Sequence, residues 1–427
     1  MIDLSNKYIE KQKERRGIQA LIIWCVLFFT LLLLRDGFMI AVNKNIFTLM
    51  AMVCVVTMTT EQVLCLYAFL FPLYFGLPGN YLTILLLLKM LTDIKHVRFT
   101  VLGFVATLLV CAYALGQNMV DGKMGIIHMV FVISLVLVFF IFQYQGRIRK
   151  NTFVVLYSAG VAALGLIMLV GTLTVHELED LMSVGSRLGT TSAGYAEKGV
   201  MNVIVDPNFY GSFAISAISV AVPLALKGKI GKAGRLMLLL FSVISLSVGI
   251  IGLSRAFLLV IVAWFILYLF SQKNVKSALT VLIVLTLICL LVFALVPDAL
   301  EAVFERFEDA DMETGNGRIR LMNQFLSMWG ETLASMLFGV GLFNCSVHCT
   351  PLQYLYGGGL ILVFLLFVYI FCSLKEGNGK FGTGFSMERI LPFMVTFVMM
   401  CTIPSATMLS SMFPLIYVAL VAWKLKD

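Results

Sequence analysis

Arg255 is a residue whose type and setting suggest phosphate chemistry. It follows Gly252-Leu253-Ser254 and lies between two apolar runs. Its guanidinium offers a fixed fork of N–H donors that binds two phosphate oxygens at once, without a metal ion. An ionisable residue beside an apolar run is a functional hypothesis by default, so we expect Arg255 to bind a phosphate group. The alternative is an anchor that keeps its charge in water at the end of a helix.

A second pair of arginines follows a glycine-rich turn. Arg318 and Arg320 come after residues 314–317 (Thr-Gly-Asn-Gly) and open a predicted helix. Because free amides at a helix N-terminus favour anions, we expect both side chains to bind the same phosphate-containing ligand. The alternative is a pair of solvated loop charges among nearby acidic residues. Arg187, farther upstream, is a weaker member of the same group.

His348 is the candidate for proton transfer. A neutral imidazole accepts a proton near neutral pH, here from a hydroxyl group of a substrate. A single histidine is more often structural, and that alternative stays open. Cys345 and Cys349 flank it as Cys-x-x-His-Cys, but a tetrahedral structural zinc site needs a fourth ligand and no second pair is evident. We therefore expect no metal and no other cofactor.

Asp206 and Asn208 are weaker candidates for a supporting role. They flank Pro207 directly before an apolar run. Asparagine is a common N-cap residue, so Asp206-Pro207-Asn208 is also explained as a plain helix start with Asn208 as the cap of the span.

The composition indicates which kind of fold must position these residues. Hydrophobic residues make up 60% of the 427 residues and charged residues only 13%, whereas soluble domains carry roughly 25% charge. The net charge of +8 is spread over short loops without a basic stripe, which argues against nucleic acid. We expect an all-α, polytopic integral membrane bundle, with residues 1–427 as a single membrane domain.

Apolar stretches of about 15 to 23 residues mark the expected membrane spans. They predict about fourteen spans, and a count of twelve stays open because the second to fourth stretches are short. The expected spans are 17–34, 46–60, 63–78, 80–92, 99–116, 124–143, 152–174, 208–226, 236–252, 256–271, 277–296, 357–373, 389–404 and 406–424.

The basic residues predict the orientation. With the N-terminus inside, 21 of the 31 Lys and Arg residues fall in cytoplasmic segments, as the positive-inside rule requires. Both termini are then cytoplasmic, and two long segments, 175–207 and 297–356, lie outside. Loops of that length are usually functional, so we expect the site on the outer face.

The second outer segment is expected to be partly helical. Asp298 and Glu301 form a capping-box pattern after Pro297. An apolar stripe at helical spacing suits a helix that lies on the bilayer surface. The stripe consists of Ile319, Met322, Leu326 and Trp329.

An outward-facing site has no access to cytoplasmic nucleotides. Any synthetic chemistry there must draw on an activated group that is already attached to a lipid, and sugars on polyprenyl diphosphate are such donors. A diphosphate leaving group needs cations, which the outer arginines supply.

Four segments occur in a characteristic order along the second half of the chain. They are Asp206 to Gly211 (Asp-Pro-Asn-Phe-Tyr-Gly), Ser254-Arg255, Gly317-Arg318 with Trp329 and Phe338 to Gly341, and His348 through Leu355 to Gly357. Together they resemble the O-antigen polymerase and ligase family of bacterial membrane glycosyltransferases, over roughly residues 185–375. Two positions differ from the family pattern: Cys349 stands where an asparagine commonly follows the histidine, and Tyr356 replaces an acid.

The resemblance implies metal-independent, inverting glycosyl transfer in the bacterial cytoplasmic membrane. Arg255 and Arg318 would bind the diphosphate of an undecaprenyl-type donor, and His348 would assist the acceptor hydroxyl. The expected function is a polymerase that joins lipid-linked repeat units into O-antigen or capsule. The expected partners are membrane lipids, the lipid-linked substrate, and the flippase and chain-length regulator of that cell-envelope pathway. The alternatives are a ligase that moves glycan to another acceptor, such as the lipopolysaccharide core, and a flippase or transporter of lipid-linked sugars, for which only Lys89 lies clearly within a span.

Overall fold

The computed structural model describes eleven ranges of the chain. They are residues 2–98, 100–122, 125–146, 148–177, 206–227, 230–271, 299–308, 318–345, 347–374, 386–403 and 409–425, with Leu181 and a few single residues between 279 and 290. The regular elements within these ranges are all helices. The expected all-α class is therefore confirmed for the described part of the chain.

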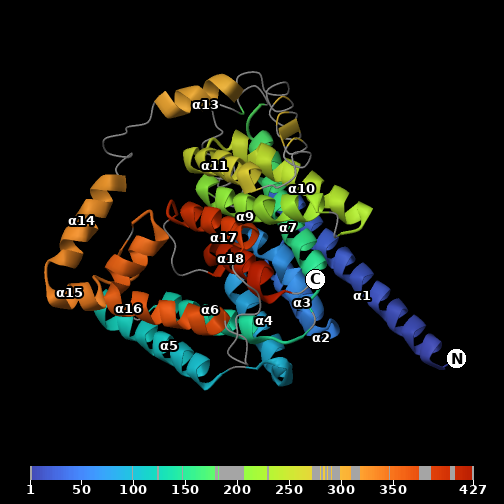
Figure 1. Ribbon diagram of the computed structural model, residues 1–427, viewed down its shortest axis with the longest axis horizontal. Coiled ribbons are helices and arrows are strands. Elements are labelled where there is room, and N and C mark those ends of the chain that lie inside the picture. The colour runs from blue at the N-terminus through green and yellow to red at the C-terminus, as the bar shows by residue number, and fades with distance from the viewer. Residues whose placement is uncertain are drawn as a thin grey trace.

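The helices form one bundle, from which the N-terminal half of α1 projects (Figure 1). The α-helices are α1 (Ile2–Leu32), α2 (Asn45–Thr57), α3 (Thr60–Leu70), α4 (Gly79–Thr92), α5 (Val101–Asp121), α6 (Ile126–Gln143), α7 (Lys150–Leu173), α9 (Pro207–Leu226), α10 (Lys232–Ile251), α11 (Arg255–Ser271), α13 (Ala299–Glu308), α14 (Arg318–Gly330), α15 (Leu333–Phe338), α16 (Thr350–Leu374), α17 (Met387–Met400) and α18 (Leu409–Ala419). Short 3-10 and π-helices are η1 (Leu33–Gly37), η2 (Pro72–Gly76), η3 (Ile94–His96) and η5 (Leu420–Lys424).

Seven helices of the described residues are long and apolar enough to cross a membrane. They are Arg16–Gly37, α5, α6, α7, α9, α10 and α16. The helices α2, α3, α4, α11 and Met412–Lys424 are apolar but shorter. The expected number of twelve to fourteen spans stays a prediction beyond these seven, and the expected span 277–296 lies outside the described ranges.

The region expected as one span over 63–78 is interrupted. The helix α3 has 11 residues and ends at Leu70, and η2 begins at Pro72. Proline has no N–H to continue the helical hydrogen bonds, which explains the break. A helix of 11 residues covers roughly 17 Å, about half of the hydrocarbon core of a bilayer.

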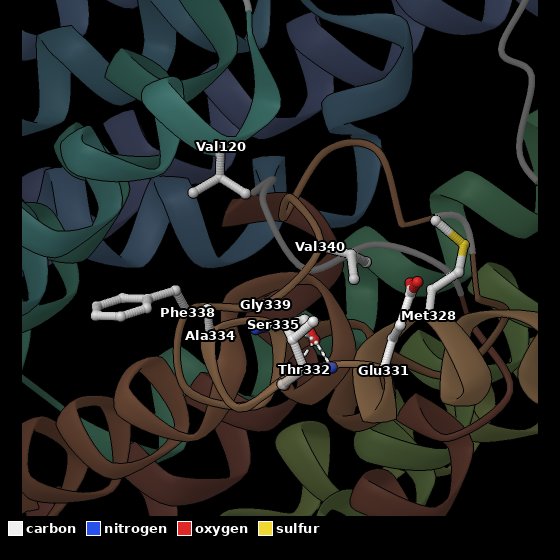
Figure 2. Close-up of a pocket in the computed structure, with 9 residues that line it drawn as sticks. All are labelled: Val120, Met328, Glu331, Thr332, Ala334, Ser335, Phe338, Gly339 and Val340. Carbon is white, nitrogen blue, oxygen red and sulfur yellow. Dashed lines mark hydrogen bonds between the residues drawn. The ribbon is translucent and has the colours of Figure 1, made fainter.

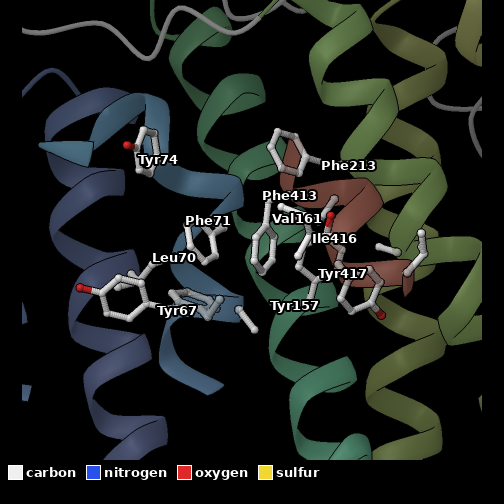
Figure 3. Packing of buried hydrophobic residues seen from close by; sticks show 14 of the residues in the cluster. Tyr67, Leu70, Phe71, Tyr74, Tyr157, Val161, Phe213, Phe413, Ile416 and Tyr417 are labelled. Carbon is white, nitrogen blue, oxygen red and sulfur yellow. The ribbon is translucent and has the colours of Figure 1, made fainter. Parts of the chain in front are cut away.

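Aromatic side chains hold the centre of the bundle, where α7 packs against α3, α9 and α10. Phe71 stacks on Phe413 with ring centroids 3.8 Å apart, and Tyr157 stacks on Tyr417 at 3.7 Å (Figure 3). The Tyr157 hydroxyl also shares a hydrogen bond of 2.8 Å with the Ser216 hydroxyl, which joins α7 to α9. Stacked rings thus tie the end of α3 to α18, and α18 to α7.

One end of the bundle, which we call the site end, is marked by contacts between helix ends. The Thr174 hydroxyl after α7 donates to the Gly37 carbonyl at 2.8 Å. The Thr350 hydroxyl at the start of α16 donates to the Ile403 carbonyl, also at 2.8 Å. The starts of α9 and α11 lie at this end as well, because both helices run antiparallel to the neighbours that end there.

The opposite end is marked in the same way. The Gln145 amide donates to the His96 carbonyl at 2.8 Å, which joins the segments after α6 and after α4. Lys227 after α9 forms an ion pair with Glu388 at the start of α17. Each contact thus joins two segments that the positive-inside rule assigns to the same side.

The second long segment is partly helical, as expected, since it holds α13, α14 and α15. Figure 1 shows α14 and α15 along one edge of the molecule, beside the start of α16. The predicted stripe is divided in the structure: Ile319 and Leu326 are exposed, whereas Met322 and Trp329 pack against an apolar cluster. The stripe is divided because Phe325 is the buried centre of that face.

The boundaries of the two long segments differ from expectation at one point. The span after the second long segment was expected from residue 357. Helix α16 already begins at Thr350, but it is broken at Gly359, whose φ of 74° is not helical, so the part beyond the break starts close to the expected residue. Most of the first long segment, residues 175–207, and Asp298 of the predicted capping box lie outside the described ranges.

Candidate functional site

The start of α9 and the turn before α11 are joined at the site end. The Asp206 side chain accepts a hydrogen bond from the Asn208 amide at 2.7 Å and thereby caps α9. The Ser254 hydroxyl donates to the Asn208 Oδ1 at 2.7 Å and accepts from the Phe257 amide at 3.2 Å, so it caps α11. The helix start that the sequence left open as an alternative is therefore present, but its cap is Asp206 and not Asn208, because Asn208 is already in the first turn of α9. Their exposure, full for Asp206 and partial for Asn208, leaves both accessible for a second role.

Arg255 is held by the tight turn between α10 and α11. Leu253 in this turn has a φ of 48°, in the left-handed region that non-glycine residues seldom adopt. Arg255 is the first residue of α11, and its side chain is half-buried. A cation at this position adds to the positive end of the helix dipole, so the turn concentrates positive charge at one point of the site end.

The segment from Phe338 to Cys349 is tied to α16 by backbone hydrogen bonds. The Val340 amide donates to the Tyr356 carbonyl at 2.9 Å, and the Gly341 amide donates to the Gly357 carbonyl at 3.0 Å. Gly339 has a φ of 80°, and a Cβ there would lie 2.1 Å from the Gly357 carbonyl oxygen. Two of the segments that carry the family resemblance are thus in direct backbone contact.

An apolar cluster beneath His348 fixes both α14 and the loop. Its buried members are Phe325, Cys345, Val347, Cys349 and Tyr356, and the Trp329 ring packs on it from α14. His348 lies between two of these buried residues but is itself exposed. The cysteines therefore face inward while the imidazole faces solvent. Cys349 lies beside Cys401, and the hydrogen bond between the two thiols lowers the pKa of the Cys349 thiol.

His348 responds to charges from two other elements. Partial burial and the Arg318 guanidinium lower the pKa of the His348 imidazole, and the Asp206 carboxylate acts in the opposite direction. The net lowering favours the neutral imidazole, which is the form that accepts a proton. His348 therefore lies within electrostatic range of Arg318 and Asp206, which come from segments far apart in the sequence.

The remaining predicted residues lie less centrally. Arg320 is exposed on α14, two residues after Arg318 at the helix start. Arg187 lies outside the described residues. Arg255 is connected to this group indirectly. Its neighbour Ser254 donates a hydrogen bond to Asn208, two residues after Asp206.

A row of polar side chains on α5 was not found from the sequence. Tyr113, Gln117 and Asp121 follow one another at intervals of four, on one face of the helix. The Tyr113 hydroxyl donates to the Gly358 carbonyl at 2.8 Å, the Gln117 side chain donates to the Phe338 carbonyl at 2.9 Å, and Asp121 accepts from the Phe343 amide at 3.2 Å. The spacing was the available signal, since three polar residues at that interval are unusual in an apolar helix.

A shallow cavity of about 460 Å³ lies next to this segment (Figure 2). Its lining combines apolar side chains with the polar start of α15, and none of the site residues predicted from the sequence contributes to it. The lining residues are Val120, Met328, Glu331, Thr332, Ala334, Ser335, Phe338, Gly339 and Val340.

Comparison with known proteins adds no relative: no family model, no curated protein and no solved structure matches the chain.

Proposed function

We propose that this protein is a multi-pass membrane glycosyltransferase that polymerises lipid-linked oligosaccharide repeat units at the outer face of the bacterial cytoplasmic membrane. The observation that carries the proposal is the exposed His348, which lies on the loop tied to α16 and within electrostatic range of Arg318 and Asp206. The hydrogen bond between Ser254 and Asn208 adds the Arg255 turn to the same end of the bundle. An imidazole with a lowered pKa, together with two helices that each begin with an arginine, suits glycosyl transfer from a diphosphate.

The exposed surface of the bundle supports a location in the membrane. Large apolar side chains are exposed on several helices, among them Phe270 on α11 (87%), Leu236 on α10 (70%) and Phe367 on α16 (69%). Soluble monomers rarely expose such continuous apolar surface, whereas lipid tails cover it at no cost. The balance of basic residues then puts both termini in the cytoplasm and the site end outside.

The two arginines suit a diphosphate ligand. Arg255 and Arg318 are the first residues of α11 and α14, where the helix amides already favour an anion. Each guanidinium can form two parallel hydrogen bonds to phosphate oxygens. Arg320 and Arg187 are secondary candidates for the same ligand. The proposal needs no metal ion and no other cofactor.

The proposed reaction balances with the groups at hand. The acceptor hydroxyl attacks the anomeric carbon of the donor from the face opposite the diphosphate, and its proton passes to His348. The bond between the anomeric carbon and the diphosphate oxygen breaks, and polyprenyl diphosphate leaves with the bonding electrons. Arg255 and Arg318 stabilise the charge that develops on this leaving group. The glycosidic bond forms with inverted configuration.

Two other functions use parts of the same structure. A ligase would run the same step with a different acceptor. A transporter would need a charged residue that faces a cavity within the membrane, and Lys89 was the one clear candidate. The Lys89 ammonium instead donates to the Val55 carbonyl at 2.9 Å, in the last turn of α2, where a cation is favourable. This contact gives Lys89 a structural role.

The proposed function is tested with purified protein in lipid vesicles that contain lipid-linked repeat units. We expect a ladder of lipid-linked glycans that differ by one repeat unit, without added partner proteins. The flippase and chain-length regulator of the pathway would alter supply and length but not the bond formed. Transfer only when a second lipid acceptor is added would indicate the ligase. Movement of the lipid-linked sugar across the bilayer without any new bond would indicate the transporter.

A further inference from the structure

A buried aspartate and histidine lie behind the loop that carries His348. The Asp121 Oδ2 at the end of α5 and the His128 Nε2 in the first turns of α6 are 2.8 Å apart, with side-chain exposures of 3% and 2%. The other carboxylate oxygen of Asp121 accepts the Phe343 amide at 3.2 Å. Both oxygens of Asp121 are therefore engaged, one by the histidine and one by the loop.

The hydrogen bonds determine which form of His128 fits. Since Asp121 accepts, the His128 Nε2 must carry the proton and donate it. The His128 Nδ1 is buried and has no hydrogen-bond partner among the described residues. A bare lone pair at Nδ1 costs less in such a place than an unpaired N–H, so the neutral tautomer with Nε2–H fits best.

The pair contacts the loop through more than one group. The Phe343 ring lies edge-on to the His128 ring with centroids 4.2 Å apart. The Asn344 side chain donates to the Asp121 carbonyl at 3.5 Å. A Cβ on Gly341, whose φ is 105°, would lie 2.4 Å from the Asp121 Oδ1, so the backbone approaches the carboxylate as closely as glycine allows. These contacts lie four to seven residues before His348.

We propose that Asp121 and His128 are positioning residues, which hold the segment Gly341–Cys349 so that the His348 imidazole stays within range of the Arg318 and Asp206 charges. The significance of this positioning for catalysis rests on the proposed function, but the positioning itself does not. A second Asp–His pair in the chain offers the matched control. His96 and Asp93 interact at 2.5 Å at the opposite end of the bundle, where their side chains are partly exposed.

The test measures the state of His348 without any enzymatic assay. Diethyl pyrocarbonate acylates the neutral imidazole, so the rate of His348 modification against pH, followed by mass spectrometry of its peptide, reports its pKa. In the wild type this pKa should lie below the ordinary value of about 6.5. In Asp121→Ala and His128→Ala the released loop should carry His348 away from Arg318 and into water, and the pKa should rise towards the ordinary value. Asp93→Ala should leave it unchanged.

The conservative variant His128→Gln separates positioning from bulk stability. Its amide nitrogen can occupy the place of Nε2 and donate to Asp121, so the His348 pKa should stay close to that of the wild type. Unchanged modification profiles in both alanine variants would overturn the proposal, and so would a His128→Gln profile that matches His128→Ala. If the profiles shift as expected but the wild type forms no polymer, the positioning stands and the proposed function fails.

Discussion

At the scale of single residues, His348 is governed by charges from two other elements. Asp206 raises the pKa of its imidazole, and Arg318 together with partial burial lowers it. Asp206→Asn should keep the N-cap of α9, because asparagine caps equally well, and remove only the charge. The His348 pKa should then fall further, so the acid limb of the polymerisation rate should move to lower pH. Initial rates between about pH 4.5 and 8, which bracket the ordinary histidine pKa, check this. A limb that moves to higher pH would contradict the assigned contact.

Arg255 and Arg318 should be needed for leaving-group departure. Replacement of either by alanine removes charge-assisted hydrogen bonds that are strongest in the transition state, and the polymerisation rate should fall about 10²- to 10³-fold. Lysine should restore only part of the rate, since it is a point charge without the fork. Arg320→Ala, at an exposed position on α14, should lose less. Wild-type rates in both alanine variants would remove the pair from the mechanism, and inhibition by a chelator would argue for a metal ion.

Some of the site residues could be predicted because the residues next to them in the sequence form a recognisable pattern, and others could not. Arg255, Arg318 and His348 stood out by residue type, turn composition and the order of motifs. Asp121 and His128 did not, because the partner of Asp121 is Phe343, 222 positions away. Neither hydrophobic periodicity nor a local motif connects Asp121 with Phe343. Asp121 and Phe343 meet because α5 packs against α16, and the loop that carries Phe343 leads into α16.

At the scale of elements, the close approach of the loop to α5 depends on Gly341. Its φ of 105° and the short distance to Asp121 leave no room for a Cβ. Gly341→Ala should destabilise the fold by about 1 to 3 kcal/mol through backbone strain. The purified variant should unfold at a lower temperature than the wild type. Gly330→Ala is the control, because a Cβ there meets nothing within 4 Å, and it should unfold at or above the wild-type temperature. Equal unfolding temperatures for the two variants would be inconsistent with this loop geometry.

Helices were easier to predict than their boundaries. Apolar length located α6, α7 and α9 to within two residues, because nothing interrupts their hydrophobic runs. Helix α5 instead continues to Asp121 and α10 begins at Lys232, where polar residues hide the helix ends. The first turns of α16, before the break at Gly359, were missed because Thr350, Pro351 and Gln353 interrupt the apolar pattern, although proline fits the first turn of a helix. The backbone pairing of Val340 with Tyr356 has no counterpart in a hydropathy profile.

At the scale of the whole molecule, the account requires the site end to face outward. An alkaline phosphatase fusion after Glu331, which is exposed between α14 and α15, should be active. Fusions after Lys227 or before Glu388, which form an ion pair at the opposite end, should be inactive. The basic residues would otherwise face the wrong side of the membrane. Activity with the reverse pattern would place His348 in the cytoplasm and remove the reason for a lipid-linked donor.

The central claim is that His348 accepts the proton of the acceptor hydroxyl, and the rate of polymer formation by His348→Ala tests it most directly. General-base catalysis is typically worth about 10² to 10⁴ in rate, so this variant should lose that factor while it still binds the lipid-linked donor. Cys349→Ala, which changes a buried neighbour that faces Cys401 instead, should keep most of the activity. A His348→Ala variant that polymerises at the wild-type rate would contradict the account.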